Sequence, residues 1–175
     1  MPKKLIRQFE ILENERKEVL QMLEGVADEQ FNKNPSAEKW SAAQVLSHIY
    51  MAESQTLASI QWRLANKKSF PRVKWLAYIV IYYVVFTFKI KLKRKAPEFV
   101  AKVPEYTAKE ALLNLWEQNR KDWKTFLGEF PDRLTHRIVF KHPVMGYLSL
   151  PLTMVFMINH LQLHKEQIKK TLQTV

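Results

Sequence analysis

The sequence MINHLQLHKEQI, residues 157–168, combines apolar residues at helical spacing with two histidines four positions apart. Residues at i and i+4 lie on the same face of an α-helix, so His160 and His164 present their rings on one side. Met157 and Ile168 share that face, which indicates that it points into the protein. The segment therefore predicts an interior helix with two imidazoles directed toward one point.

A third histidine lies on another expected helix, which covers residues 42–66. Val45 and Ala52 bracket His48 there, so its ring is also expected to face inward. Three imidazoles converging from two helices suit a divalent first-row metal and leave positions open for water or substrate. A hydrogen-bonded core histidine would show the same spacing, so spacing alone leaves both interpretations open. Residues 161–163 are Leu, Gln and Leu, which excludes the HExxH motif of zinc proteases.

Four long amphipathic segments cover most of the chain and predict an all-α fold. The second begins with Ser41 as N-cap and Gln44 three residues later, the pattern of a capping box. A loop of about twenty residues, 128–147, precedes the last helix and is long enough to be a functional loop or a packed connection. The four segments are expected to form a four-helix bundle, with helices over residues 4–24, 42–66, 108–127 and 149–172.

Residues 75–88, WLAYIVIYYVVFTF, form an uninterrupted apolar run of 14 residues. A helix of that length rises about 21 Å, less than the roughly 30 Å of a bilayer core. Its aromatic and β-branched residues also fit a buried strand, but no second convincing strand is evident, so we favour a helix. We interpret residues 69–104 as an enlarged apolar and basic connection, inserted between the second and third bundle helices of one domain that spans residues 1–175.

Composition excludes several classes of function. The chain has three glycines and no cysteine, so Rossmann and Walker loops, disulfides and thiol nucleophiles are excluded. Residues 1–15 are too charged for a signal peptide, and we expect a cytoplasmic location. The net charge of +11 is concentrated partly in KIKLKRK, residues 89–95. That block carries no recognition motif, so we expect no specific nucleic-acid partner.

Three segments resemble the DinB/YfiT-like superfamily of four-helix proteins, which are described as metal-dependent enzymes. They are KWSAAQVLSHIYMAE (39–53), HPVMGYLSLP (142–151) and MINHLQLHKEQI (157–168). In that family a Trp-Ser opening precedes the helix with the first metal histidine, and a closing H-x3-H supplies the other two. The resemblance implies a metal site at His48, His160 and His164. Residues 69–104 depart from the compact family pattern.

The resemblance implies metal-dependent hydrolysis, or transfer of a low-molecular-weight thiol as in the bacillithiol and mycothiol transferases of the superfamily. We favour thiol transfer to a small molecule, because hydrolysis usually needs a carboxylate on the attacking water. Glu53, five residues after His48, points away from that ring, and Glu166 lies on another face than His164. No catalytic residue is assigned. The expected cofactor is a divalent transition metal, either zinc, nickel, iron or manganese.

Two other classes of function are retained as alternatives. A four-helix domain of this kind could be a non-catalytic, stress-related protein that binds a metal or a small molecule. The apolar run at 75–88 beside the basic block could also associate with a membrane surface. We favour a homodimer, in which the helix expected over residues 75–88 is covered by the second copy.

Several further residues are candidates for supporting roles. His142 is expected either near the mouth of the site or as a turn-forming residue, and Trp40 as a core anchor before the second helix. Tyr50, Asn159 and Gln162 are candidate hydrogen-bond partners for the metal ligands. Packing or surface roles are equally compatible with their positions.

Overall fold

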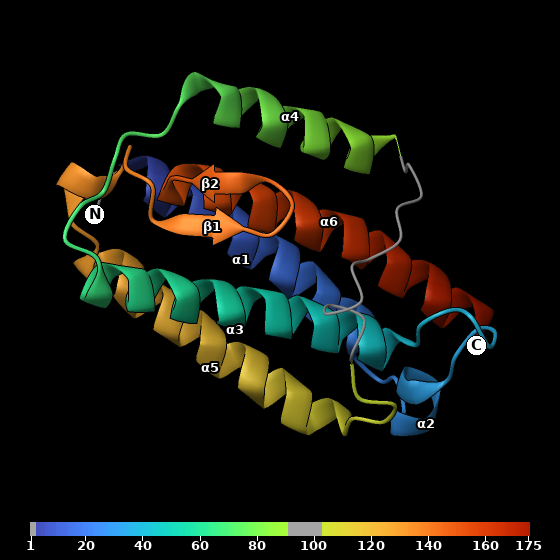
Figure 1. Ribbon diagram of the computed structural model, residues 1–175. Helices are drawn as coiled ribbons and strands as arrows, with labels where there is room; N and C mark the ends of the chain where they lie inside the picture. Colours follow the sequence, from blue (N-terminus) through green and yellow to red (C-terminus); the bar gives the residue numbers. More distant parts are fainter. Residues whose placement is uncertain (1–2, 91–102) are drawn as a thin grey trace.

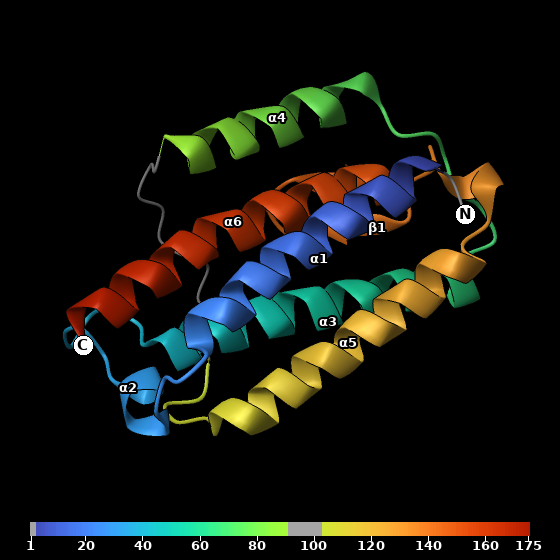
Figure 2. The same cartoon turned by 180° about the vertical axis from the view of Figure 1, so that it is seen from behind.

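The computed structural model describes residues 3–90 and 103–175 and confirms the all-α four-helix bundle (Figure 1). Helix α6 packs against α1 and α3, and α3 also packs against α5. Figure 2 shows the same four helices from behind, with α1 crossing in front of α6. The bundle helices are α1 (Lys3–Leu23), α3 (Ala42–Asn66), α5 (Lys109–Glu129) and α6 (Leu150–Thr174), close to the expected bounds.

Local sequence signals fix where the helices begin and end. The hydroxyl of Ser41 accepts a hydrogen bond from the backbone N–H of Gln44 at 3.2 Å, and the Gln44 side chain accepts from the Ser41 N–H at 3.0 Å. This confirms the capping box that starts α3. Helix α1 ends just before Gly25, whose φ of 71° is a left-handed conformation that glycine adopts without strain.

The structure contains short elements that the sequence did not predict. A five-residue helix, α2 (Asp28–Asn32), follows α1. The expected loop at 128–147 instead holds a 3-10 turn, η2 (Asp132–Leu134), and a hairpin of β1 (Phe140–His142) and β2 (Gly146–Leu148). Phe140 pairs with Leu148 and His142 with Gly146. Strands of three residues are too short to give an alternating pattern, which explains why the segment looked irregular.

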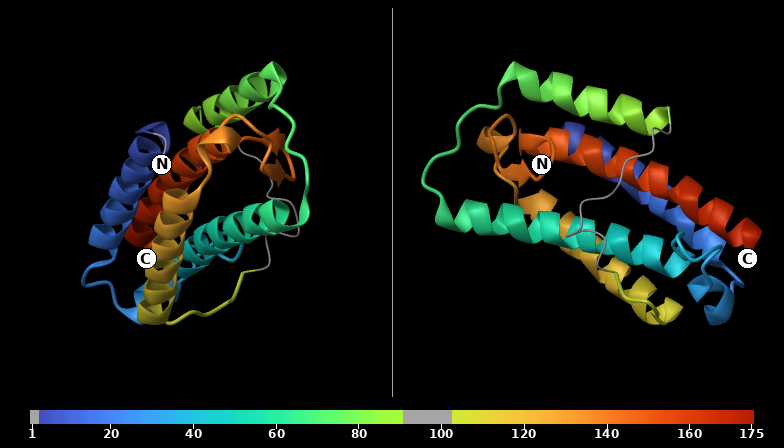
Figure 3. Two further views of the ribbon diagram at one scale, coloured as in Figure 1. Left: turned by 90° about the vertical axis from the view of Figure 1, so that its left-hand side faces the viewer. Right: turned by 45° about the vertical axis from the view of Figure 1, so that its right-hand side comes forward.

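The apolar run forms a helix, α4 (Trp75–Lys89), and not a strand. It lies outside the four-helix bundle, along α6 and the β2 side of the hairpin, as the two views of Figure 3 show. None of the helices in the described part of the chain is both long and apolar enough to cross a bilayer. Most of the basic block at 89–95 lies outside the described residues. That the connection is enlarged relative to the family stays a prediction.

The core runs the length of the bundle and fixes the spacing of α3 and α6. Fully buried aliphatic side chains from α1, α3 and α6 meet at its centre, and Trp116 and Trp123 fill it from α5. Ile81 and Val84 of α4 are buried as well, so one face of that helix belongs to the core. Because α3 and α6 are packed side by side, residues near their middles are held at a fixed distance.

Candidate metal centre

The three histidines singled out by the sequence lie together between α3 and α6. Nε2 of His160 lies 3.1 Å from Nε2 of His48 and 3.0 Å from Nε2 of His164. One ligand atom from each ring lies within 4.8 Å of the other two. We call these residues the histidine cluster. Their convergence from two helices is what a shared metal site requires.

The three rings form T-shaped pairs instead of stacking. The three ring pairs have centroid separations of 4.5 to 5.1 Å and interplanar angles of 66° to 85°. An imidazole binds a metal through a nitrogen lone pair at its edge, in the plane of the ring. The short Nε2–Nε2 distances show that the coordinating nitrogens of the rings are nevertheless brought close to one another.

Gln167 determines which nitrogen of His164 carries the proton. Nδ1 of His164 lies 2.9 Å from the side-chain oxygen of Gln167, one turn further along α6. That oxygen can only accept, so Nδ1 carries the hydrogen and Nε2 keeps its lone pair for the cluster. Metal-binding histidines commonly have such an outer partner, which fixes their tautomer and orientation.

The nitrogen spacing fits a single bound cation. Zinc lies about 2.0–2.1 Å from histidine nitrogens, so two ligands at 90° to 109° around it are about 2.9 to 3.4 Å apart. Both Nε2 separations at His160 fall in that range. A proton on His160 Nε2 could point along only one of the two contacts. One cation among the three nitrogens satisfies both, so the donor set fits a divalent metal.

The surroundings keep the rings of His160 and His164 neutral, which is the form that binds metals. Burial lowers the pKa of His160 well below its ordinary value, and the neighbouring rings of His164, His48 and His142 lower it further. Burial and His48 lower the pKa of His164 to about 4, against the opposing effect of its bond to Gln167. At neutral pH protons therefore do not compete with a metal for these nitrogens.

Aromatic side chains form one wall of the cluster. The ring of Phe156 stacks on His160 with centroids 5.0 Å apart and an interplanar angle of 23°. Phe88 of α4 lies 6.4 Å from His160, and Trp40 lies 5.5 Å from His48. His48 is buried, whereas His160 and His164 are half-buried. The cluster is thus shielded by apolar groups but keeps the solvent access that an incoming ligand needs.

No carboxylate joins the histidine cluster in the described part of the chain. Glu53 lies on α3 five residues after His48, but its oxygens accept hydrogen bonds from Trp116 at 2.8 Å and Arg120 at 2.8 and 3.0 Å. It faces α5 and therefore points away from His48, as the sequence predicted. The ligands are neutral, and a divalent ion among them would keep its full charge.

His142 lies beside the cluster and also forms a turn. Its Nδ1 accepts hydrogen bonds from the backbone N–H groups of Val144 and Met145, at 3.1 and 3.2 Å, which orders the hairpin. Since Nδ1 is an acceptor, Nε2 carries the hydrogen. The ring lies 4.6 Å from Phe156, and burial lowers the pKa of His142 to about 4. Both roles expected for His142, turn-forming residue and neighbour of the site, therefore occur together.

The other proposed supporting residues have different roles. Asn159 donates to the backbone oxygen of Val155, and Gln162 donates to Glu15, so neither amide is directed at a ligand. Tyr50 and Trp40 are partly buried against the core. Sequence reasoning missed Gln167, although its position three residues after His164, on the same side of a helix, was a usable signal.

Comparisons with known proteins identify the family and support the fold. A family model described as the DinB superfamily matches residues 11–168. Among curated protein sequences, none matches the chain. A solved structure, of a conserved protein from Enterococcus faecalis, has a TM-score of 0.65 at 15% identity, covering 100% of this chain and 98% of its own.

Two further solved structures share the architecture. YfiT from Bacillus subtilis, described as "a probable metal-dependent hydrolase with an unusual four-helix bundle topology", has a TM-score of 0.63 at 15% identity, covering 98% of this chain and 87% of its own. TT2238, described as a four-helix bundle protein, has a TM-score of 0.60 at 15% identity, covering 94% and 97%. At this identity the likeness shows the fold alone.

Proposed function

The chain belongs to the DinB superfamily, and from that premise we propose that it is a divalent-metal-dependent enzyme that transfers a low-molecular-weight thiol to an electrophilic small molecule. The convergence of His48, His160 and His164 carries the proposal. A divalent ion held there would supply Lewis acidity and lower the pKa of a coordinated thiol or water.

The absence of a carboxylate from the cluster favours a thiol over water as the nucleophile. A thiol with an ordinary pKa of about 8.5 needs little assistance to lose its proton near neutral pH. Water needs a stronger drop in pKa or a positioned general base. Glu53 is held by Arg120 and Trp116, and Nδ1 of His142 is held by the hairpin backbone, so neither is free to act as that base.

The proposed reaction is a substitution at carbon. The thiol sulfur forms a bond to the electrophilic carbon, the leaving group departs with the bonding electron pair, and the thiol proton passes to solvent. The aromatic wall of Phe156 and Phe88 would exclude water from the electrophile. The N–H at Nε2 of His142, next to Phe156, would donate a hydrogen bond to the departing group.

The first test measures metal content and turnover on the same preparation. We expect about one divalent ion per chain by elemental analysis. We also expect a fluorescent conjugate from monochlorobimane with one of the thiols cysteine, glutathione or bacillithiol. His160→Ala should lose both the ion and the activity, whereas the matched variant His136→Ala, at an exposed histidine outside the cluster, should keep both. Metal content unchanged in His160→Ala would contradict the site.

Hydrolysis is the second candidate, supported by the description of YfiT. The same preparation would then release nitrophenol from p-nitrophenyl esters without added thiol, in a way that chelators abolish. Saturable metal binding with no turnover in either assay would favour a non-catalytic binding protein.

A further inference from the structure

Helix α4 exposes an apolar surface that does not pack against the bundle. Six of its residues, each more than half exposed, form what we call the α4 stripe: Trp75, Leu76, Ile79, Tyr82, Tyr83 and Phe86. At about 100° per residue they fall within one sector of roughly 120°. The opposite face is buried through Ile81 and Val84. A helix surface that faces solvent is normally polar, so the α4 stripe indicates a binding surface.

The basic residues are concentrated in the stretch of sequence that contains α4. Residues 54–97 contain ten of the 28 basic residues and none of the 17 acidic ones, so this segment accounts for +10 of the net charge of +11. Lys67, Lys68, Arg72 and Lys74 precede α4 and are exposed. The rest of the chain is almost neutral. A single anionic partner on the α4 side of the molecule would explain both the exposed basic residues before α4 and the apolar stripe.

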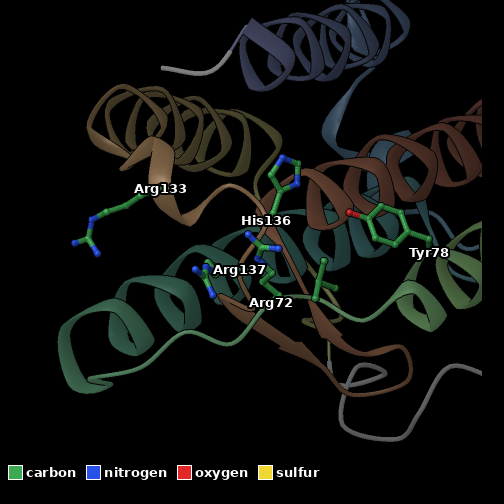
Figure 4. A pocket seen from close by; sticks show the side chains of 6 residues that line it. Arg72, Tyr78, Arg133, His136 and Arg137 are labelled. Atoms are coloured by element: carbon green, nitrogen blue, oxygen red, sulfur yellow. The ribbon is translucent and has the colours of Figure 1, made fainter.

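A pocket of about 380 Å³ lies at the amino-terminal end of α4. Arg72, Arg133, Arg137, His136, Tyr78 and Val73 line it, and we call it the arginine pocket. Figure 4 shows the side chains of Arg72, Arg137 and His136 gathered together, with the hydroxyl of Tyr78 directed toward them from α4 and Arg133 extending outward on the other side.

Backbone hydrogen bonds hold the segments that carry Arg72 and Arg137 together. The Val73 N–H donates to the carbonyl of His136 at 3.1 Å, and the Ile138 N–H donates to that of Pro71 at 2.9 Å, which places Arg72 opposite Arg137. Among the described residues none of the three pocket arginines forms an ion pair with a carboxylate. Guanidinium groups gathered in this way repel one another, and a phosphate oxyanion would bridge them.

We propose that the α4 stripe and the arginine pocket together form a docking surface for an anionic phospholipid bilayer. The stripe enters the interface, where tryptophan and tyrosine are favoured because their rings are amphipathic. The pocket receives the phosphate of a lipid headgroup, and the lysines before α4 add attraction to the negative surface. The helix lies in the plane of the interface and does not cross it.

A second copy of the chain fits this surface less well. Lys74 stands immediately before α4, and Lys89 is its last residue. Two stripes packed parallel bring Lys74 of one copy beside Lys74 of the other, and two packed antiparallel bring Lys74 of each copy toward the end of α4 at Lys89 of the other. Both arrangements bring basic residues together, and the described residues 67–90 include no acid to offset them, which costs affinity. An anionic bilayer has the opposite charge along the whole stripe.

Vesicle co-sedimentation tests the proposal on the full chain. We expect binding to vesicles that contain phosphatidylglycerol, none to phosphatidylcholine alone, and weakening as salt increases. The variant Arg72→Ala/Arg137→Ala should lose roughly fivefold in partitioning for each charge removed. Ile79→Ser/Phe86→Ser, which changes exposed residues only, should lose binding by about tenfold or more because it removes apolar area.

The matched control removes two charges elsewhere. Lys121→Ala/Lys124→Ala changes α5, on the opposite side of the bundle from α4 (Figure 1), and should leave partitioning within about twofold. Equal losses in both charge variants would mean bulk attraction only and would overturn the assigned surface. Absence of binding to anionic vesicles at low salt overturns the proposal. So does a dimer in sedimentation velocity that Ile79→Ser/Phe86→Ser dissociates, because the second copy then occupies the stripe.

Discussion

Helix α3 carries two polar groups inside the same bundle, and their surroundings differ. On the side of α5, Glu53 is buried with Arg120, whose Nε lies 2.8 Å from Glu13. Arg16 completes this group through Glu13 at 3.1 Å. On the side of α6, His48 meets His160 and His164, and within residues 3–90 and 103–175 no carboxylate joins them. We call the first group the Glu53 cluster.

The difference is one of charge balance. In the Glu53 cluster two guanidinium groups face two buried or half-buried carboxylates, and Trp116 donates a further hydrogen bond, so the protein's own residues satisfy the charges. The histidine cluster directs its Nε2 atoms at one another, and no carboxylate of the described residues belongs to it. A buried carboxylate balanced by a guanidinium of its own chain is structural, whereas neutral nitrogens that converge on one point are arranged to hold a ligand from outside.

Breaking the Glu53 cluster should have the largest effect on stability. Arg120→Ala leaves the Glu53 carboxylate buried without its charge partner, and we expect the free energy of unfolding to fall by about 3–5 kcal/mol. Urea denaturation measures this. The control Arg7→Ala removes an exposed arginine of α1 and should change the free energy of unfolding by less than about 0.5 kcal/mol. Metal stoichiometry should stay the same in folded Arg120→Ala. If it falls, the two clusters are not independent.

Removing the central ligand of the histidine cluster should have the opposite effect: metal binding is lost while the fold is kept. His160 is the ring that lies within 3.1 Å of both other Nε2 atoms, so His160→Gln should weaken metal binding by more than about 100-fold. The helical circular-dichroism spectrum should remain unchanged. Calorimetric titration of metal-free protein with zinc gives the affinity. Equal affinity in His160→Gln and wild type would show that the cluster is a hydrogen-bonded core feature and no metal site.

The sequence predicted the histidine cluster better than the Glu53 cluster. His160 and His164 are four residues apart and His48 sits among apolar neighbours, so helical periodicity placed each ring on an inward face, and the family resemblance implied that the three share one site. The partners of Glu53 lie more than sixty residues away on α5, and only the packing of α3 on α5 brings them close. The exposed face of α4 was also unpredictable, because the helix is apolar all round and periodicity gives no preferred side.

The pH dependence of stability should report the histidine cluster. Burial lowers the pKa of His164 from 6.5 to about 4, so between these values the unfolded ring takes up a proton and the folded ring does not. Stability is therefore full above pH 6.5 and is lost as the pH falls toward 4. At pH 5 this one ring should account for about 2 kcal/mol.

Metal-free protein is the material for this measurement, because a bound metal would add its own proton competition. The difference in unfolding free energy between pH 7 and pH 5 should shrink by that amount in His164→Gln. The control variant Lys124→Gln, at an exposed residue of α5, should keep the full difference. A pH dependence equal in all three proteins would mean that the folded environment does not disfavour the charged ring.

The smallest expected effect distinguishes a ligand from its outer partner. Gln167 accepts a hydrogen bond from Nδ1 of His164 and so holds the lone pair of Nε2 toward the cluster. Gln167→Leu keeps a similar volume but lets the ring turn or change tautomer, and we expect metal affinity to fall by about tenfold with unchanged stoichiometry. Gln167→Glu should restore the affinity or exceed it, because a carboxylate accepts the same hydrogen bond more strongly. If both variants lose affinity equally, Gln167 only packs against His164. If neither variant loses affinity, the His164 ring is oriented by α6 alone. The histidine cluster then needs no hydrogen bond from a residue outside its three members, unlike the Glu53 cluster, where Trp116 supplies one.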